Sequence, residues 1–124
     1  MNKLDLAKTR NLNSLKLKHS SKIHRNCLRT GRGESESHAL MKYWICRVLL
    51  SMKKEFVCEA VFENGSRADV YVLDDDIAIE VLISEKEKSI LLKTNKYPCV
   101  ITTVSVDDCI DMKGVFKLLE DLLV

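Results

Sequence analysis

The chain has 124 residues, of which 46% are hydrophobic and 31% charged, and this suits one globular domain with one core. No run of residues is long and apolar enough to span a membrane, and the start is too polar for a secretory signal. Its five cysteines show no paired spacing, so we expect reduced thiols and a cytoplasmic location. These properties argue against membrane-spanning proteins and disulfide scaffolds.

Charge is spread unevenly along the chain. The net charge is +2, but the first 32 residues hold nine lysines and arginines against the single acid Asp5, and the remainder is acidic. A basic arm on an acidic body indicates a polyanion partner, with a solubilising tail as the alternative. Residues 1–33 show no sustained helical or strand period, so we expect a mobile arm that orders on its partner. Residues 34–124 form the predicted domain.

The predicted domain begins with a helix. Gly31-Arg32-Gly33 interrupts the chain, and Ser35 or Ser37 suits the N-cap of a helix that runs to about Met52. The apolar residues expected on its buried side are Leu40, Tyr43, Trp44, Val48 and Leu50.

Three strands are predicted next. Residues 55–63 alternate in character and end at Asn64-Gly65, a strong tight-turn signal. The stretch 67–84 then holds two runs rich in β-branched residues on either side of Asp74-Asp75-Asp76. Such runs favour strands, and the acidic triplet favours a turn between them. We therefore expect an antiparallel meander.

The last third of the domain returns to helices. Residues 85–95 predict a helix, 99–106 a continuous apolar strand buried on both faces, and about 110–123 a final helix. The β-α-β crossover places the fourth strand parallel to the third. The expected fold class is α/β, with the order α-β-β-β-α-β-α and a mixed four-stranded sheet covered by helices.

Two acids stand out in the predicted hairpin. Asp69 lies near the start of its first strand and Glu80 inside its second, among apolar neighbours. A buried carboxylate is costly unless it is paired or binds a metal. Mg²⁺ prefers such oxygen ligands and leaves places for water and phosphate. Each acid alone could equally lie on a solvated strand face, so the pair is the informative feature.

This order of elements, with these acids, resembles the PD-(D/E)XK nuclease superfamily and its restriction-endonuclease-like core, over about residues 34–106. Members usually show a glutamate in the first helix, an aspartate at the start of the second strand and Glu-x-Lys in the third. Glu36 (or Glu34), Asp69 and Glu80 match these positions. The motif lysine is replaced by Leu82.

The resemblance implies a lysine from elsewhere, as in some branches of the superfamily. Lys86 is our first candidate because it follows the third strand most closely, and Lys88 and Lys93 are the others. Without such a lysine, catalysis would be weak or absent and the fold would serve to bind DNA.

The function implied is hydrolysis of DNA phosphodiester bonds by an endonuclease that uses Mg²⁺ (or Mn²⁺). Asp69, Glu80 and the backbone carbonyl of Val81 are the implied metal ligands, and Glu36 would bind a metal or orient its water. A homodimer is also implied, since small nucleases of this fold commonly pair to cut two strands. Backbone phosphates of DNA would contact basic residues of the arm, namely Lys16, Lys18, Lys22, Arg25, Arg29 and Arg32.

Two alternatives come from other functional classes. The chain could be a catalytically inactive member of this fold that binds DNA, or a small α/β interaction protein whose acids are surface charges. Metal-dependent cleavage distinguishes an enzyme from the inactive DNA-binding protein. Salt-sensitive DNA binding distinguishes both of these from the interaction protein.

Overall fold

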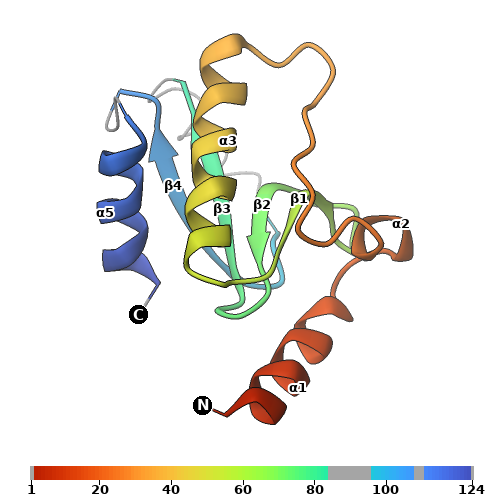
Figure 1. Cartoon of the computed structure of the whole chain (residues 1–124). Coiled ribbons are helices and arrows are strands. Elements are labelled where there is room, and N and C mark those ends of the chain that lie inside the picture. Colours follow the sequence, from red (N-terminus) through yellow and green to blue (C-terminus); the bar gives the residue numbers. More distant parts are fainter. Residues whose placement is uncertain (1, 84–95, 108–110, 124) are drawn as a thin grey trace.

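The computed structural model describes residues 2–83, 96–107 and 111–123. Within these ranges the chain is a mixed α/β domain (Figure 1) whose elements are α1 (Lys3–Ser14), α2 (His19–Lys22), α3 (Glu36–Ser51), β1 (Phe56–Val61), β2 (Arg67–Val72), β3 (Ile77–Leu82), β4 (Val100–Ser105) and α5 (Met112–Leu122). The order predicted from the sequence is confirmed for the strands and for the helices at α3 and α5. The helix predicted at 85–95 lies outside the described residues.

The sheet has the predicted topology. Its strands lie in the order β1-β2-β3-β4. β1 pairs with β2 and β2 with β3 in antiparallel fashion, whereas β4 runs parallel to β3. β4 is therefore at an edge, and only Val104 of its six residues is buried. The prediction that this strand is buried on both faces is wrong, because an edge position leaves much of the strand uncovered.

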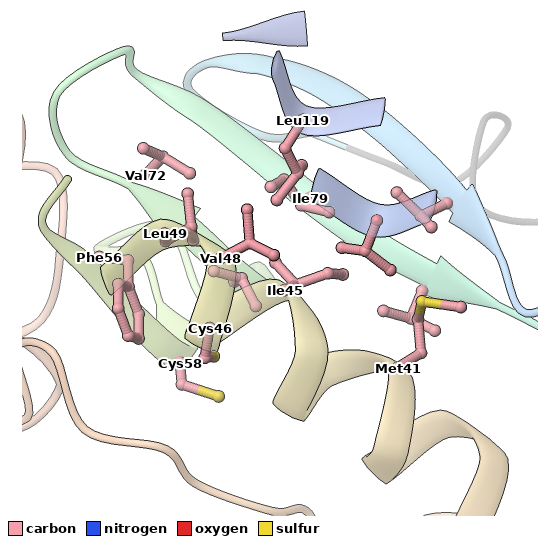
Figure 2. Packing of buried hydrophobic residues seen from close by; sticks show 14 of the residues in the cluster. Met41, Ile45, Cys46, Val48, Leu49, Phe56, Cys58, Val72, Ile79 and Leu119 are labelled. Carbon is pink, nitrogen blue, oxygen red and sulfur yellow. The ribbon is translucent and has the colours of Figure 1, made fainter. Parts of the chain in front are cut away.

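Helices α3 and α5 cover one face of the sheet. Ser35 is the N-cap of α3 and accepts a hydrogen bond from the His38 amide at 3.2 Å. Figure 2 shows side chains of α3 packed over those of the sheet and of α5. The buried positions of α3 are Met41, Lys42, Ile45, Cys46, Val48 and Leu49.

The buried side of α3 differs from the predicted one. Leu40, Tyr43 and Leu50 were expected in the core, but they are 46%, 40% and 42% exposed. Both faces of this helix are rich in apolar residues, so its sequence leaves the orientation open, and the sheet selects the face with Ile45 and Leu49 at its centre.

The opposite face of the sheet is covered partly by the arm. Leu17, between α1 and α2, is fully buried in a second cluster with Phe62, Tyr71 and Leu73. The Phe62 and Tyr71 rings meet edge to face with centroids 5.1 Å apart. Leu17 also forms an isolated antiparallel bridge with Phe62. One residue of the arm thus completes a hydrophobic layer of the body.

Residues 2–33 contact the body, and the mobility that the sequence predicts for this arm stays a prediction. Asn2 caps α1 by accepting a hydrogen bond from the Asp5 amide at 2.8 Å. The amide of the Asn13 side chain donates to the Leu73 carbonyl at 2.7 Å. Contacts such as the second join segments far apart in the sequence, so hydrophobic periodicity within the arm does not reveal them. No helix within the described ranges has the length and apolar character needed to cross a membrane.

Candidate functional site

The candidate site lies where the β2–β3 hairpin opens. Registered pairing of these strands extends from Val72 opposite Ile77 to Val70 opposite Ile79. At the next position, the side chains of Asp69 and Glu80 accept hydrogen bonds from backbone amides of the opposite strand. Asp69 Oδ2 accepts from the Val81 amide at 2.7 Å, and Glu80 Oε1 accepts from the Asp69 amide at 3.2 Å. The structure thus brings the two predicted acids together.

A histidine of α3 approaches this pair. His38 Nε2 lies 3.2 Å from Asp69 Oδ2, and its Nδ1 lies 3.0 Å from Glu34 Oε1. Glu34 immediately precedes the N-cap of α3 and is held by the Gly31 amide, which donates to its Oε2 at 3.1 Å. The imidazole is therefore fixed between two carboxylates, one from the helix start and one from the sheet.

The chain of contacts continues to a buried lysine. Lys42 lies one turn after His38 on α3, its side chain is fully buried, and its Nζ is 2.8 Å from Glu34 Oε1. The same ammonium group pairs with Glu59 of β1. A buried lysine needs such partners, because an uncompensated charge in the interior is very costly. A continuous polar path thus joins Glu59, through α3, to Asp69.

Burial and like charge drive the pKa values of the two acids apart. Burial first, and then the negative charge of Asp69, raise the pKa of Glu80 to about 8. Burial acts in the same direction on Asp69, but the hydrogen bonds from His38 and the Val81 amide outweigh it and lower its pKa. At neutral pH the pair therefore holds one proton, and Glu80 carries it.

The two cationic groups of the path are stabilised in their charged forms. The hydrogen bond with Asp69 is the main cause that raises the pKa of His38. Burial by itself would lower the pKa of Lys42, but its hydrogen bonds with Glu34 and Glu59 outweigh this effect and raise it. The imidazolium form of His38 can donate to both neighbouring carboxylates.

Tyr97 joins the site from the segment before β4. Its hydroxyl lies 2.6 Å from Glu80 Oε1 and also contacts the carbonyl oxygen of Arg67. A phenol has one proton, so it donates to one of these oxygens at a time. Protonation of Glu80 at neutral pH leaves Tyr97 free to donate to Arg67.

Two overlapping sets of side chains could hold a metal ion. Ligand atoms of Glu34, His38 and Asp69 all lie within 4.8 Å of one another. Lys42, however, already neutralises Glu34 and would repel a dication bound there. The Asp69 and Glu80 carboxylates offer hard oxygen ligands of the kind that suits Mg²⁺ or Mn²⁺, and the cation that contacts this pair is the imidazole of His38 at Asp69.

The remaining predicted catalytic and metal residues have separate positions. Glu36 lies in the first turn of α3 and is exposed, whereas the alternative, Glu34, joins the polar path through its contacts with His38 and Lys42. Leu82 is buried at 4% exposure. The Val81 amide is engaged by Asp69, and the role of its carbonyl as a ligand stays a prediction. Lys86, like Lys88 and Lys93, lies outside the described residues.

Two of the basic residues predicted to bind DNA form ion pairs with the body. Lys16 Nζ pairs with Asp76 at 2.6 Å, and Arg25 pairs with Glu55 at 3.1 Å. These two charges are compensated within the chain, which reduces what they can contribute to a polyanion partner. The others are exposed or half-buried, namely Lys18, Lys22, Arg29 and Arg32.

Lys42 and Tyr97 are site residues that the sequence did not indicate in advance. A signal existed for Lys42, because it follows His38 by four residues between the buried Met41 and Ile45. Tyr97 had no such signal, since only the return of the chain into β4 brings it to Glu80.

Comparison of the chain with protein-family models, curated proteins and solved structures finds no match. The function must therefore be inferred from the chemistry of the site itself.

Proposed function

We propose that the chain is a metal-dependent endonuclease with a restriction-endonuclease-like core, which hydrolyses DNA phosphodiester bonds. The observation that carries the proposal is the pair of carboxylates at the open end of the β2–β3 hairpin, where Asp69 and Glu80 are linked through the backbone. The antiparallel meander followed by a parallel fourth strand supports it, because it matches the expected core of the superfamily.

Asp69 and Glu80 would hold Mg²⁺ or Mn²⁺ between them. The metal supplies neutralisation of phosphate charge and a water of lowered pKa. Hydrogen bonds from His38 and the Val81 amide keep Asp69 ionised and oriented. Glu80 must lose the proton that burial and Asp69 retain on it, so metal binding is expected to release a proton near neutral pH.

His38 is the cation that the site itself presents. Its side chain is 18% exposed, and the hydrogen bond with Asp69 raises its pKa, so a cationic imidazole is favoured beside Asp69. Lys42 has no exposed side-chain surface and cannot touch a substrate. We assign Lys42 as a positioning residue that orients His38 through Glu34.

The test is a cleavage assay on plasmid and branched DNA with Mg²⁺, with Mn²⁺ and with EDTA. The proposal expects cleavage with metal, none with EDTA, and none for Asp69→Asn. Cleavage by Asp69→Asn at the wild-type rate would contradict the assignment of the site.

A catalytically inactive DNA-binding protein is the second candidate. The contacts of Glu80 with Tyr97 and the Asp69 amide, together with the apolar Leu82, favour it, because a metal must compete for ligands that already have partners. In this case the wild type binds DNA in a salt-sensitive manner without cleavage, and Leu82→Lys gains cleavage. A loss of cleavage in Lys86→Ala would instead support Lys86 as the catalytic lysine.

A further inference from the structure

A polar pocket lies between α2, the end of the arm and the first two strands. It has a volume of about 360 Å³ and is lined by Ser20, Ser21, His24, Arg29, Thr30, Gly31, Glu59, Val61 and Arg67. Within the described part of the chain, neither guanidinium group of this lining forms an ion pair or a side-chain hydrogen bond. Three hydroxyl groups and an imidazole complete it. The lining contains no Phe, Tyr or Trp, so it offers donors and positive charge rather than a surface for stacking bases.

The walls of the pocket are held in place by contacts outside it. The Arg29 carbonyl accepts from Cys58 Sγ at 3.1 Å. Ser21 is 2% exposed, and its Oγ accepts from the Val61 amide at 2.8 Å, which leaves its proton free to donate. These contacts fix the backbone at Arg29 and the Ser21 side chain before a ligand arrives, and preorganisation of this kind lowers the cost of binding.

The single acid of the lining does not cancel this positive character. Glu59 is paired with Lys42, which also pairs with Glu34, so its charge is partly compensated from the interior of the domain. A Cβ built on Gly31 would lie 3.5 Å from Glu59 Oε1, so the arm passes directly over this carboxylate. Glu59 also places the pocket at one end of the polar path that leads through Lys42 and Glu34 to the candidate site.

We infer that this pocket binds a phosphate group of a nucleic-acid strand. Arginine presents paired donors that match phosphate oxygens, and hydroxyl groups add further hydrogen bonds. The inference goes beyond the proposed hydrolysis, on which it depends only for the choice of DNA as the strand. It assigns phosphate contact to Arg29 and Arg67 together, from the arm and from β2, rather than to the basic arm as a whole.

The experiment measures binding of the full chain to a short labelled DNA duplex by fluorescence anisotropy, with EDTA present so that no cleavage occurs. Arg29→Gln and Arg67→Gln are each expected to weaken binding about tenfold, the effect of losing a charge-assisted hydrogen bond. Arg32→Gln is the matched control, because Arg32 is exposed and carries the same charge outside the pocket. It is expected to weaken binding about twofold.

Further measurements separate binding in the pocket from a general loss of positive charge and from a loss of folding. Arg29→Lys should recover part of the affinity, and thermal melts of all variants should coincide with the wild type. Millimolar inorganic phosphate should compete with DNA for the wild type but weakly for Arg29→Gln. Asp69→Asn should keep the same dependence on Arg29 and Arg67, so a failure of hydrolysis would leave this result unaffected. Equal losses for all three arginines, or a wild type that binds phosphate but no DNA, would overturn the inference.

Discussion

The two ends of the β2–β3 hairpin use the same residue types in opposite ways. At the turn, each acid has its own cation: Arg10 Nε lies 2.8 Å from Asp74, Lys54 Nζ 2.8 Å from Asp75, and Lys16 Nζ 2.6 Å from Asp76. At the open end, Asp69 and Glu80 lie against each other, and the imidazole of His38 contacts Asp69.

The difference separates structural acids from candidate functional ones. The ion pairs at the turn hold the arm and the segment before β1 against it. Each carboxylate there is neutralised by its own cation, so the turn does not attract a metal ion. At the open end, burial first and then the negative charge of Asp69 raise the pKa of Glu80 to about 8, so Glu80 retains a proton at neutral pH. An excess of buried carboxylate is the condition under which a metal ion binds favourably.

The largest expected effect is a loss of cleavage when acids at the open end of the β2–β3 hairpin are substituted, but not when an acid at the turn is. Asp69→Asn and Glu80→Gln should each reduce metal-dependent cleavage by roughly a thousandfold, because each removes a metal ligand and its charge. Asp75→Asn is the control at the turn, and its cleavage rate should match the wild type. Initial rates of plasmid nicking give the comparison, and equal losses at both ends would remove the distinction.

Removal of the buried lysine should cost the most stability. Lys42→Met leaves Glu34 and Glu59 without their cation, and loss of one partner of a buried ion pair destabilises by about 3–5 kcal/mol. Urea unfolding measures the change. The double variant Lys42→Met with Glu34→Gln should recover part of the loss. A Lys42→Met protein as stable as the wild type would show that the buried charges are not coupled.

The hydrophobic contact of the arm is tested by Leu17→Ala. Leu17 is fully buried whereas Leu15 is 63% exposed, so the two positions form a matched pair. Leu17→Ala should destabilise by about 2–4 kcal/mol through lost burial and the cavity left behind, and Leu15→Ala should have little effect. Equal melting temperatures for the two variants would indicate that the arm contributes nothing to the core.

Because Leu17 belongs to the core, deletion of the arm is expected to destabilise the domain as well as weaken DNA binding.

The charged contact of the arm is expected to be weaker. Arg10→Met removes two hydrogen bonds to Asp74, whose side chain is 7% exposed, and should cost about 2 kcal/mol. Lys8→Met removes the same charge from an exposed position of α1 and serves as the control. Chemical unfolding of both variants shows whether the turn acids act through specific pairs or through total charge.

The most gradual effect concerns the dependence of stability on pH. The pKa of Glu80 is raised from 4.5 to about 8 on folding, so the folded state binds a proton that the unfolded chain has lost in this range. Stability should therefore fall as pH rises from about 5 to 8, by at most about 1.4 kcal/mol per pH unit. Glu80→Gln should flatten this slope when unfolding is measured in EDTA. Loss of the His38 proton acts in the same direction and remains in the variant. An unchanged slope would contradict the shared proton.

Local signals were sufficient for much of the fold. Ser35 as the N-cap, the Asn64-Gly65 turn and the β-branched runs around the acidic turn each determine structure through neighbours in the sequence. The same applies to the proximity of Asp69 and Glu80, because a hairpin with a known turn fixes which residues lie opposite each other.

Other features depend on contacts between distant segments. The orientation of α3 was open in the sequence because apolar residues occur on more than one side of it, and packing against the sheet buried Ile45 rather than Tyr43. The order of the arm depends on Leu17 and on ion pairs with the β2–β3 turn, none of which produces a periodic pattern.

The sequence by itself thus determined the succession of strands, the turn between Asp69 and Glu80 and the pairing of those two acids. Only the tertiary structure decided that Glu34 rather than Glu36 contacts His38, that Lys42 is buried and pairs with Glu34, and that Tyr97 reaches Glu80. The physical reason is range: a hairpin register is set by residues close in the chain, whereas the surroundings of a carboxylate are set by every element packed against it.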